Sequence, residues 1–130
     1  MYKLAISTSG EYVSAAIFEE KLLASFVSKT NKGSTGILLN QINELFDKTK
    51  ASRNDLNALY LDVGPGYYTG LRIGLSVSQG LGAVLGIPII PVNGLDALAF
   101  AAHTSHRKIC SLIDIKRNEF AYCEYMPVPG

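Results

Sequence analysis

Hydrophobic and polar residues alternate along the first part of the chain in three runs, at residues 2–7, 12–19 and 21–28. Alternation with a period of two is typical of strands that bury one face. The connections between the runs, Ser9-Gly10 and Glu19-Glu20, are short. We therefore expect an antiparallel meander of three strands.

The pattern changes to helical spacing after a polar connection at residues 29–33, because apolar side chains then recur three and four positions apart. This spacing predicts a helix over residues 34–50, capped by Ser34 or Thr35. The apolar positions of the helix are Ile37, Leu38, Ile42, Leu45 and Phe46.

The next segment predicts a strand, a helix and a strand in succession. A strand at residues 56–63 runs into a glycine turn, and a helix capped by Thr69 covers residues 69–86. A further strand follows at residues 88–92. Parallel strands need a crossover of this kind, so the two strands are expected to lie parallel.

The last segment predicts a short helix and a hairpin. Asn93 is expected to cap a helix that ends near residue 103. Strands at residues 108–113 and 119–125 are expected to pair around a turn at Lys116-Arg117.

Three antiparallel strands followed by two parallel strands, with flanking helices, predict an α/β protein with a ribonuclease H-like (ASKHA) layer. The closing hairpin is expected to start a second layer that is missing here. We therefore divide the chain into a ribonuclease H-like domain over residues 1–106 and an incomplete subdomain over residues 107–130.

Composition narrows the classes of function. With 48% apolar residues among 130, the chain can bury a core, and a net charge of +1 provides no overall field for nucleic acid or membranes. The uncharged stretch at residues 73–92 is long enough to span a membrane, but four glycines, Pro88 and Pro91 interrupt it. The apolar start is too short for a signal peptide, which predicts a cytoplasmic protein.

The helix after the glycine turn carries a ladder of small residues, which is formed by Gly70, Gly74, Ser78, Gly82 and Gly86 at intervals of four. Glycine inside a helix costs about 1 kcal/mol relative to alanine, so a compensating interaction is expected. Small residues let another backbone approach closely, and the ladder therefore predicts a packing surface. The sequence leaves open whether that surface meets the protein's own sheet or a partner.

The glycine turn at residues 64–70 could bind a phosphate at the start of the helix, but its spacing fits neither the dinucleotide nor the P-loop fingerprint. A structural turn is the favoured interpretation. Arg72 could bind a phosphate or a partner's carboxylate, or simply be solvated. Tyr67 and Tyr68 suit either an interface or packing on the neighbouring strand.

Candidate catalytic and metal-binding residues are sparse. His103 and His106 have no cluster of further ligands at metal-binding spacing, and no serine lies in a nucleophile elbow. Cys110 and Cys123 would lie opposite each other if the hairpin turned on Lys116-Arg117, which makes a disulfide conceivable. Reduced, buried thiols are expected instead in a cytoplasmic protein.

The segment Asp62-Val-Gly-Pro-Gly-Tyr-Tyr-Thr-Gly-Leu-Arg-Ile-Gly resembles the motif G-P-G-S-F-T-G-L-R-I-G of the bacterial TsaB (YeaZ) family. Residues 80–98 resemble that family's next helix and strand, residues 4–9 its first strand, and residues 113–122 its D-A-R-x-x-E-V-Y hairpin. The resemblance covers nearly the whole chain. The family itself is longer and continues into a second subdomain.

The resemblance also has departures. The family carries an aspartate at the end of its first strand, as related ATP-binding kinases and chaperones do for metal and phosphate, and Ser7 occupies that position here. Ser34-Thr35-Gly36 replaces the family's His-Ser-Glu, and Asn40 replaces a proline. The loss of the aspartate weakens any case for ATP binding.

The resemblance implies a noncatalytic scaffold, with no cofactor, that supports threonylcarbamoylation of adenosine 37 in tRNAs that read ANN codons. Implied partners are the catalytic paralogue TsaD, the ATPase TsaE, a second copy when alone, and tRNA only through the complex. Alternatives are an ASKHA-type nucleotide-binding enzyme and a glycoprotease-like peptidase using Ser7, Thr8 or His103.

The family's pairing surface lies on its first two helices, which implies an interface on helices 34–50 and 69–86. The expected interface residues are Leu38, Ile42, Leu45, Thr69, Gly70, Arg72, Ile73, Gly74, Val77, Ser78 and Gly82.

Substitution of leucine at Gly74 or Gly82 distinguishes the two surfaces that the ladder could meet. If the ladder faces a partner, the variants stay folded and dimerise weakly, because the added bulk separates the helices. If it faces the protein's own sheet, they unfold. Sedimentation equilibrium and circular dichroism of each variant separate these outcomes.

Overall fold

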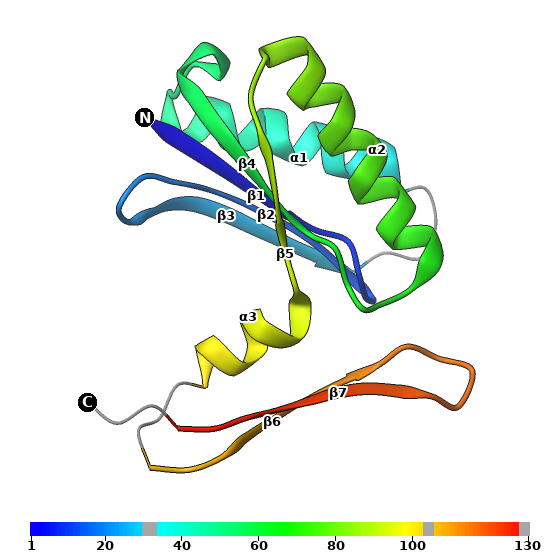
Figure 1. Ribbon diagram of the computed structural model, residues 1–130. Coiled ribbons are helices and arrows are strands. Elements are labelled where there is room, and N and C mark those ends of the chain that lie inside the picture. The colour runs from blue at the N-terminus through cyan, green and yellow to red at the C-terminus, as the bar shows by residue number, and fades with distance from the viewer. Residues whose placement is uncertain (30–33, 103–105, 128–130) are drawn as a thin grey trace.

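The computed structural model describes residues 1–29, 34–102 and 106–127. Five strands form one sheet in the order β3-β2-β1-β4-β5, and β6 and β7 form a separate hairpin (Figure 1). The described chain therefore has the predicted α/β class. The sheet strands are Tyr2–Ser7 (β1), Tyr12–Phe18 (β2), Leu22–Lys29 (β3), Leu56–Asp62 (β4) and Ile89–Val92 (β5).

Strand directions follow the prediction. β2 pairs antiparallel with both β1 and β3, whereas β4 runs parallel to β1 and to β5. The uncharged stretch at residues 73–92 therefore forms most of a helix, followed by β5. Across the described residues, no helix combines the length and the apolarity needed to cross a membrane.

Helices Ser34–Thr49 (α1) and Tyr68–Leu85 (α2) lie on the same face of the sheet (Figure 1). A short 3-10 turn, Arg53–Asp55 (η1), precedes β4. The core lies between this face and the two helices, because alternate residues of β1 and β2 point toward them. Its buried side chains include Leu4, Ile6, Val13, Ala15, Ile17, Leu38, Ile42, Leu45, Phe46, Leu59, Leu61 and Val77.

Thr69 is not the cap of α2, contrary to the sequence prediction. The helix begins at Tyr68, and Tyr67, which precedes it, makes no side-chain cap hydrogen bond. The backbone N–H of Tyr67 instead donates to the Ser9 carbonyl at 2.7 Å. A contact to the loop that follows β1 thus fixes the start of the helix. The predicted caps of α1, Ser34 and Thr35, have side chains outside the described residues.

Helix Gly94–Ala101 (α3) packs against the hairpin formed by Ile109–Asp114 (β6) and Phe120–Tyr125 (β7). Asn93 caps this helix as predicted, since its side chain accepts from the N–H of Leu95 at 2.8 Å. The buried Ser111 hydroxyl donates to the Leu95 carbonyl at 2.8 Å. The Tyr125 phenol donates to Asp96, and this bond raises the pKa of Tyr125.

The cysteines are not opposite each other in the hairpin, contrary to the turn assumed from the sequence. Cys110 pairs with Glu124, and Cys123 pairs with Ser111. The turn has three residues, Lys116 to Asn118, all with positive φ, rather than the two that were assumed. One extra turn residue shifts the register by one and sends the two thiols to opposite faces. Both are free, and Cys110 is exposed rather than buried.

The glycine ladder meets the protein's own sheet. A Cβ at Gly70 would lie under 3.0 Å from the Thr8 carbonyl oxygen, and one at Gly74 would collide with the Thr8 hydroxyl. A Cβ at Gly82 would press on Ile87 and Ile89. The prediction of a packing surface is therefore confirmed at Gly70, Gly74 and Gly82, and the atoms that they approach belong to the same chain. It is wrong at Gly86, which is the left-handed C-cap of α2 with a φ of 66° and where a Cβ would meet nothing within 4 Å.

The domain boundary at residue 106 stays a prediction. In the described part of the chain, α3 shares a layer with β6 and β7 on the side of the sheet away from α1 and α2 (Figure 1).

Gly70→Ala is expected to lower the free energy of unfolding by about 2 kcal/mol, because the added methyl group meets backbone that cannot yield without moving β1. Gly80→Ala, in the same helix with open space around it, is expected to raise that free energy by about 1 kcal/mol. Urea unfolding monitored by circular dichroism measures both. Equal effects at the two positions would show that the packing of α2 on the sheet is not as described.

Candidate functional site

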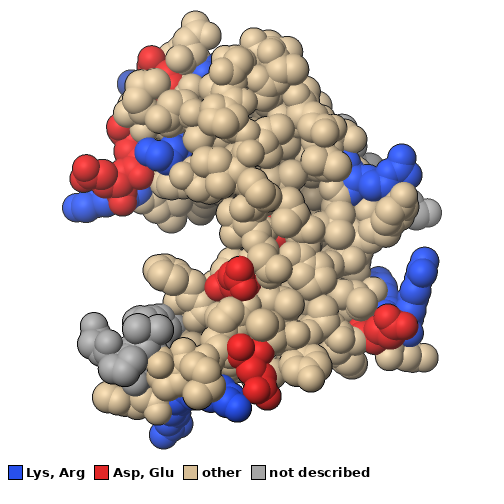
Figure 2. Space-filling view, viewed as in Figure 1, with Lys and Arg blue, Asp and Glu red and all other residues tan. Residues whose placement is uncertain are grey.

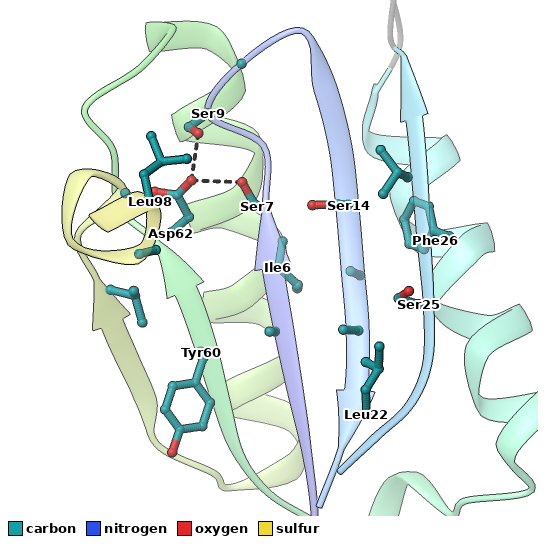
Figure 3. A pocket seen from close by; sticks show the side chains of 18 of the residues that line it. Ile6, Ser7, Ser9, Ser14, Leu22, Ser25, Phe26, Tyr60, Asp62 and Leu98 are labelled. Carbon is teal, nitrogen blue, oxygen red and sulfur yellow. Dashed lines mark hydrogen bonds between the residues drawn. The ribbon is translucent and has the colours of Figure 1, made fainter. Parts of the chain in front are cut away.

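The carboxyl ends of β1 and β4 meet at one edge of the sheet, because these neighbouring strands run parallel. β4 ends at Asp62, whose Oδ2 atom accepts hydrogen bonds from the hydroxyls of Ser7 at 2.8 Å and Ser9 at 2.6 Å (Figure 3). The other oxygen, Oδ1, accepts from the N–H of Gly64 at 2.9 Å. Both oxygens of this half-buried carboxylate are therefore engaged.

These bonds connect three segments that are far apart in the sequence. The Asp62 carboxylate joins the end of β1 to the glycine turn, and the Gly64 carbonyl accepts from the N–H of Gly94 at 2.9 Å, where α3 begins. Gly64 has a φ of 93°, a conformation that glycine adopts without strain. The turn is thus a structural joint, as the sequence favoured.

The hydrogen bonds of the glycine turn at residues 64–70 argue against a phosphate-binding loop. A phosphate cradle needs backbone N–H groups that point outward at the ligand. Here the N–H of Gly64 points to Asp62, and that of Tyr67 points to the Ser9 carbonyl. These two donors are already used within the protein.

A cavity of about 650 Å³ opens on the sheet face opposite α1 and α2, beside this cluster. Ser7, Ser9 and Asp62 lie at one end of it, and Phe26 and Tyr60 line its mostly apolar remainder (Figure 3). The space-filling view shows the same face hollowed between the sheet and the hairpin layer (Figure 2). The site therefore combines one satisfied carboxylate with an apolar surface.

The structure separates the residues predicted for the interface into two groups. Most of those on α1 and α2 point into the core and are buried: Leu38, Ile42, Leu45, Gly74, Val77, Ser78 and Gly82. Thr69 and Arg72 are exposed, while Gly70 and Ile73 are half-buried. Only this second group has surface to offer a partner, because helical periodicity turns the first group toward the sheet.

Other candidate residues are not gathered into a catalytic centre. Within the described residues, no group of three or more His, Cys, Asp or Glu side chains is placed to hold a metal ion. Thr8 is 1% exposed, and its hydroxyl donates to the Gly70 carbonyl at 2.5 Å. His103 lies outside the described residues.

Sequence reasoning missed the role of Ser9 and Asp62. The available signal was an acidic residue at the end of a buried strand, directly before a glycine turn. Its side-chain partners are Ser7, at the end of β1 and 55 residues earlier, and Ser9, in the following loop and 53 residues earlier, and periodicity alone does not bring them near.

Asp62→Ala is expected to lower the free energy of unfolding by about 3 kcal/mol, because two hydroxyls and one N–H lose a charged acceptor. Asp47→Ala on the exposed side of α1 is the matched control and should change stability by less than about 0.5 kcal/mol. Chemical unfolding gives both values. A small effect at Asp62 would contradict its role as the joint.

A family model described as TsaD, tRNA N6-adenosine threonylcarbamoyltransferase, matches residues 23–128. The tRNA threonylcarbamoyladenosine biosynthesis protein TsaB of Buchnera aphidicola subsp. Schizaphis graminum is 31% identical over 95% of this chain. TsaB of Escherichia coli strain K12 is 29% identical over 94% of it. The chain spans 60% and 54% of the length of these two relatives.

The fold agrees with these relatives. The solved structure of YeaZ from Pseudomonas aeruginosa matches with a TM-score of 0.86 and 29% sequence identity, covering 96% of this chain and 60% of that one. The matches extend over the glycine turn, the ladder helix and the hairpin. The chain therefore belongs to the family whose model is described as TsaD, tRNA N6-adenosine threonylcarbamoyltransferase, and the relatives and the solved structure that it resembles over nearly its whole length are TsaB (YeaZ) proteins.

Proposed function

We propose that this chain is a noncatalytic scaffold for the threonylcarbamoylation of adenosine 37 in tRNA. It pairs through the outer faces of α1 and α2 with the catalytic paralogue TsaD or, when alone, with a second copy. TsaE joins the assembly, and the chain reaches tRNA as part of it in the cytoplasm.

The main support for a noncatalytic role is the hydrogen bonding of the Asp62 carboxylate. In α/β proteins the carboxyl ends of parallel strands are where reactive groups gather. At this edge the carboxylate accepts three hydrogen bonds, and Ser7 stands where the family has an aspartate. A carboxylate held in this way stabilises the fold and has no second acid beside it on β1.

The outer faces of the two helices support the pairing role. The glycine ladder is used inside the chain, so the face that remains is the opposite one. That face exposes Leu39 on α1 and Leu75 and Val84 on α2, together with Thr69 and Arg72. Exposed apolar side chains framed by polar ones are typical of surfaces that bind another protein.

The rival enzymatic interpretations have less support from the residues. An ASKHA-type nucleotide-binding enzyme would use the turn at residues 64–70, where two N–H groups already bond within the protein. A peptidase would need a free nucleophile, whereas the hydroxyls of Ser7 and Thr8 both donate to oxygens of the chain.

The pairing is tested by sedimentation equilibrium of the chain alone and mixed with TsaD from the same source. A complex is expected, and Leu75→Glu should weaken it at least about tenfold by placing a charge in an apolar contact.

Leu112→Glu on the hairpin is the matched control, because Leu112 is also an exposed leucine but lies away from α1 and α2. It should leave the complex unchanged. A chain that stays monomeric and ignores TsaD, or a complex equally sensitive to both substitutions, would contradict the proposed surface.

A further inference from the structure

A second hollow lies between the start of α2 and the loop of the β6–β7 hairpin. Its volume is about 740 Å³. It is lined on one side by residues 66–69 and on the other by Ile115, Lys116, Arg117 and Glu119. We call this hollow the hairpin groove. It is separate from Asp62 and from the apolar cavity beside it.

The hairpin groove is basic at its rim. Lys116 and Arg117 line it, and Arg72 lies one helical turn from Tyr68 on α2. Glu119 is the acidic side chain in the lining, and Asp114, next to the loop, accepts the backbone N–H of Lys116 at 2.8 Å. Figure 2 shows Lys and Arg side chains at the right edge of the molecule beside an acidic patch, and further ones at the left and lower edges.

The hairpin loop holds the backbone of its two basic residues in an unfavourable conformation. Lys116 and Arg117 have φ values of 62° and 61°, in the left-handed region that glycine or asparagine occupies more readily. Strained backbone of this kind is concentrated at functional sites. A role of these side chains in binding would account for the strain.

Aromatic rings alternate with these cations. The Lys116 ammonium lies 4.6 Å from the centre of the Tyr67 ring, and the Arg72 guanidinium lies 5.4 Å from that of Tyr68. Tyr68 is 70% exposed, so most of its ring is open to a ligand. Grooves that combine cations for phosphates with exposed rings for bases are typical of single-strand recognition.

We propose that the chain also contacts tRNA directly, beyond reaching it through the complex, and that the hairpin groove binds a single-stranded segment of the tRNA substrate. Lys116 and Arg117 bind its phosphates, and the Tyr68 ring stacks on a base. The amino-terminal end of α2 adds partial positive charge at the same place. An acidic peptide would pair with the cations but leave the exposed ring without a matching group.

The hairpin groove lies next to the surface proposed to pair with TsaD. Thr69 lines both the hairpin groove and a smaller hollow of about 260 Å³ that continues along α2 past Arg72 to Ser76. RNA held in the groove would therefore lie beside the proposed pairing surface. The inference rests on the proposed function, since tRNA is the substrate of that assembly.

The test is fluorescence anisotropy of the 130-residue chain with a labelled single-stranded RNA of about twelve nucleotides, which is within the site size of such grooves, at low salt. The double variant Lys116→Ala and Arg117→Ala should bind about tenfold more weakly, and its salt slope should fall by about 1.4. Tyr68→Ala should bind about tenfold more weakly with an unchanged salt slope, because stacking releases no counterions.

Lys21→Ala combined with Lys48→Ala is the matched control. It removes the same charge at the opposite end of the sheet, in the β2–β3 turn and the last turn of α1, and should leave binding unchanged. Thermal unfolding confirms that each variant is folded.

Three outcomes would overturn the proposal. The unmodified chain does not bind the RNA, the control variant loses as much RNA affinity as the groove variants, or free ATP displaces the RNA when its concentration equals that of the labelled RNA. The sedimentation test with TsaD is independent of all three. If the chain pairs with TsaD but does not bind RNA, only the proposal for the hairpin groove is contradicted. If the chain does not pair with TsaD, the proposed function itself is contradicted.

Discussion

The close approach of α2 to the end of β1 is the constraint on which the rest of the structure depends. Thr8 is almost completely buried, and its hydroxyl donates to the Gly70 carbonyl. This contact exists because neither Gly70 nor Gly74 has a Cβ. The cost of glycine in a helix is offset here by a helix that lies directly on the sheet.

The position of α2 in turn fixes the glycine turn and the carboxylate beneath it. With the Tyr67 N–H held by Ser9, the chain between Asp62 and α2 has little freedom, and Gly64 comes within reach of the Asp62 side chain. An edge that is often catalytic in α/β proteins is here a joint between β1, β4 and α3. The same hydrogen bonds thus hold these three elements together, as the proposed scaffold role would require.

The two surfaces proposed for partners share one border. The outer faces of α1 and α2 expose Leu39 and Leu75, while the hairpin groove offers Lys116 beside Tyr67. Thr69 lies at the border between them. The start of α2 therefore positions both proposed surfaces relative to each other, as the proposed assembly on tRNA would require.

The elements, their order and the close packing along α2 could be predicted from the sequence, because periodicity and glycine spacing are local properties. It also identified Asn93 as a cap, since a cap bonds within three residues of itself. Only the tertiary structure decided that the ladder meets Thr8, that Leu38 and Val77 are core, and that Asp62 bonds to Ser9. These features depend on contacts between distant segments. The position of the two cysteines in the hairpin depended on one extra turn residue, which shifts the pairing of β6 and β7 by one residue and so places the two thiols on opposite faces.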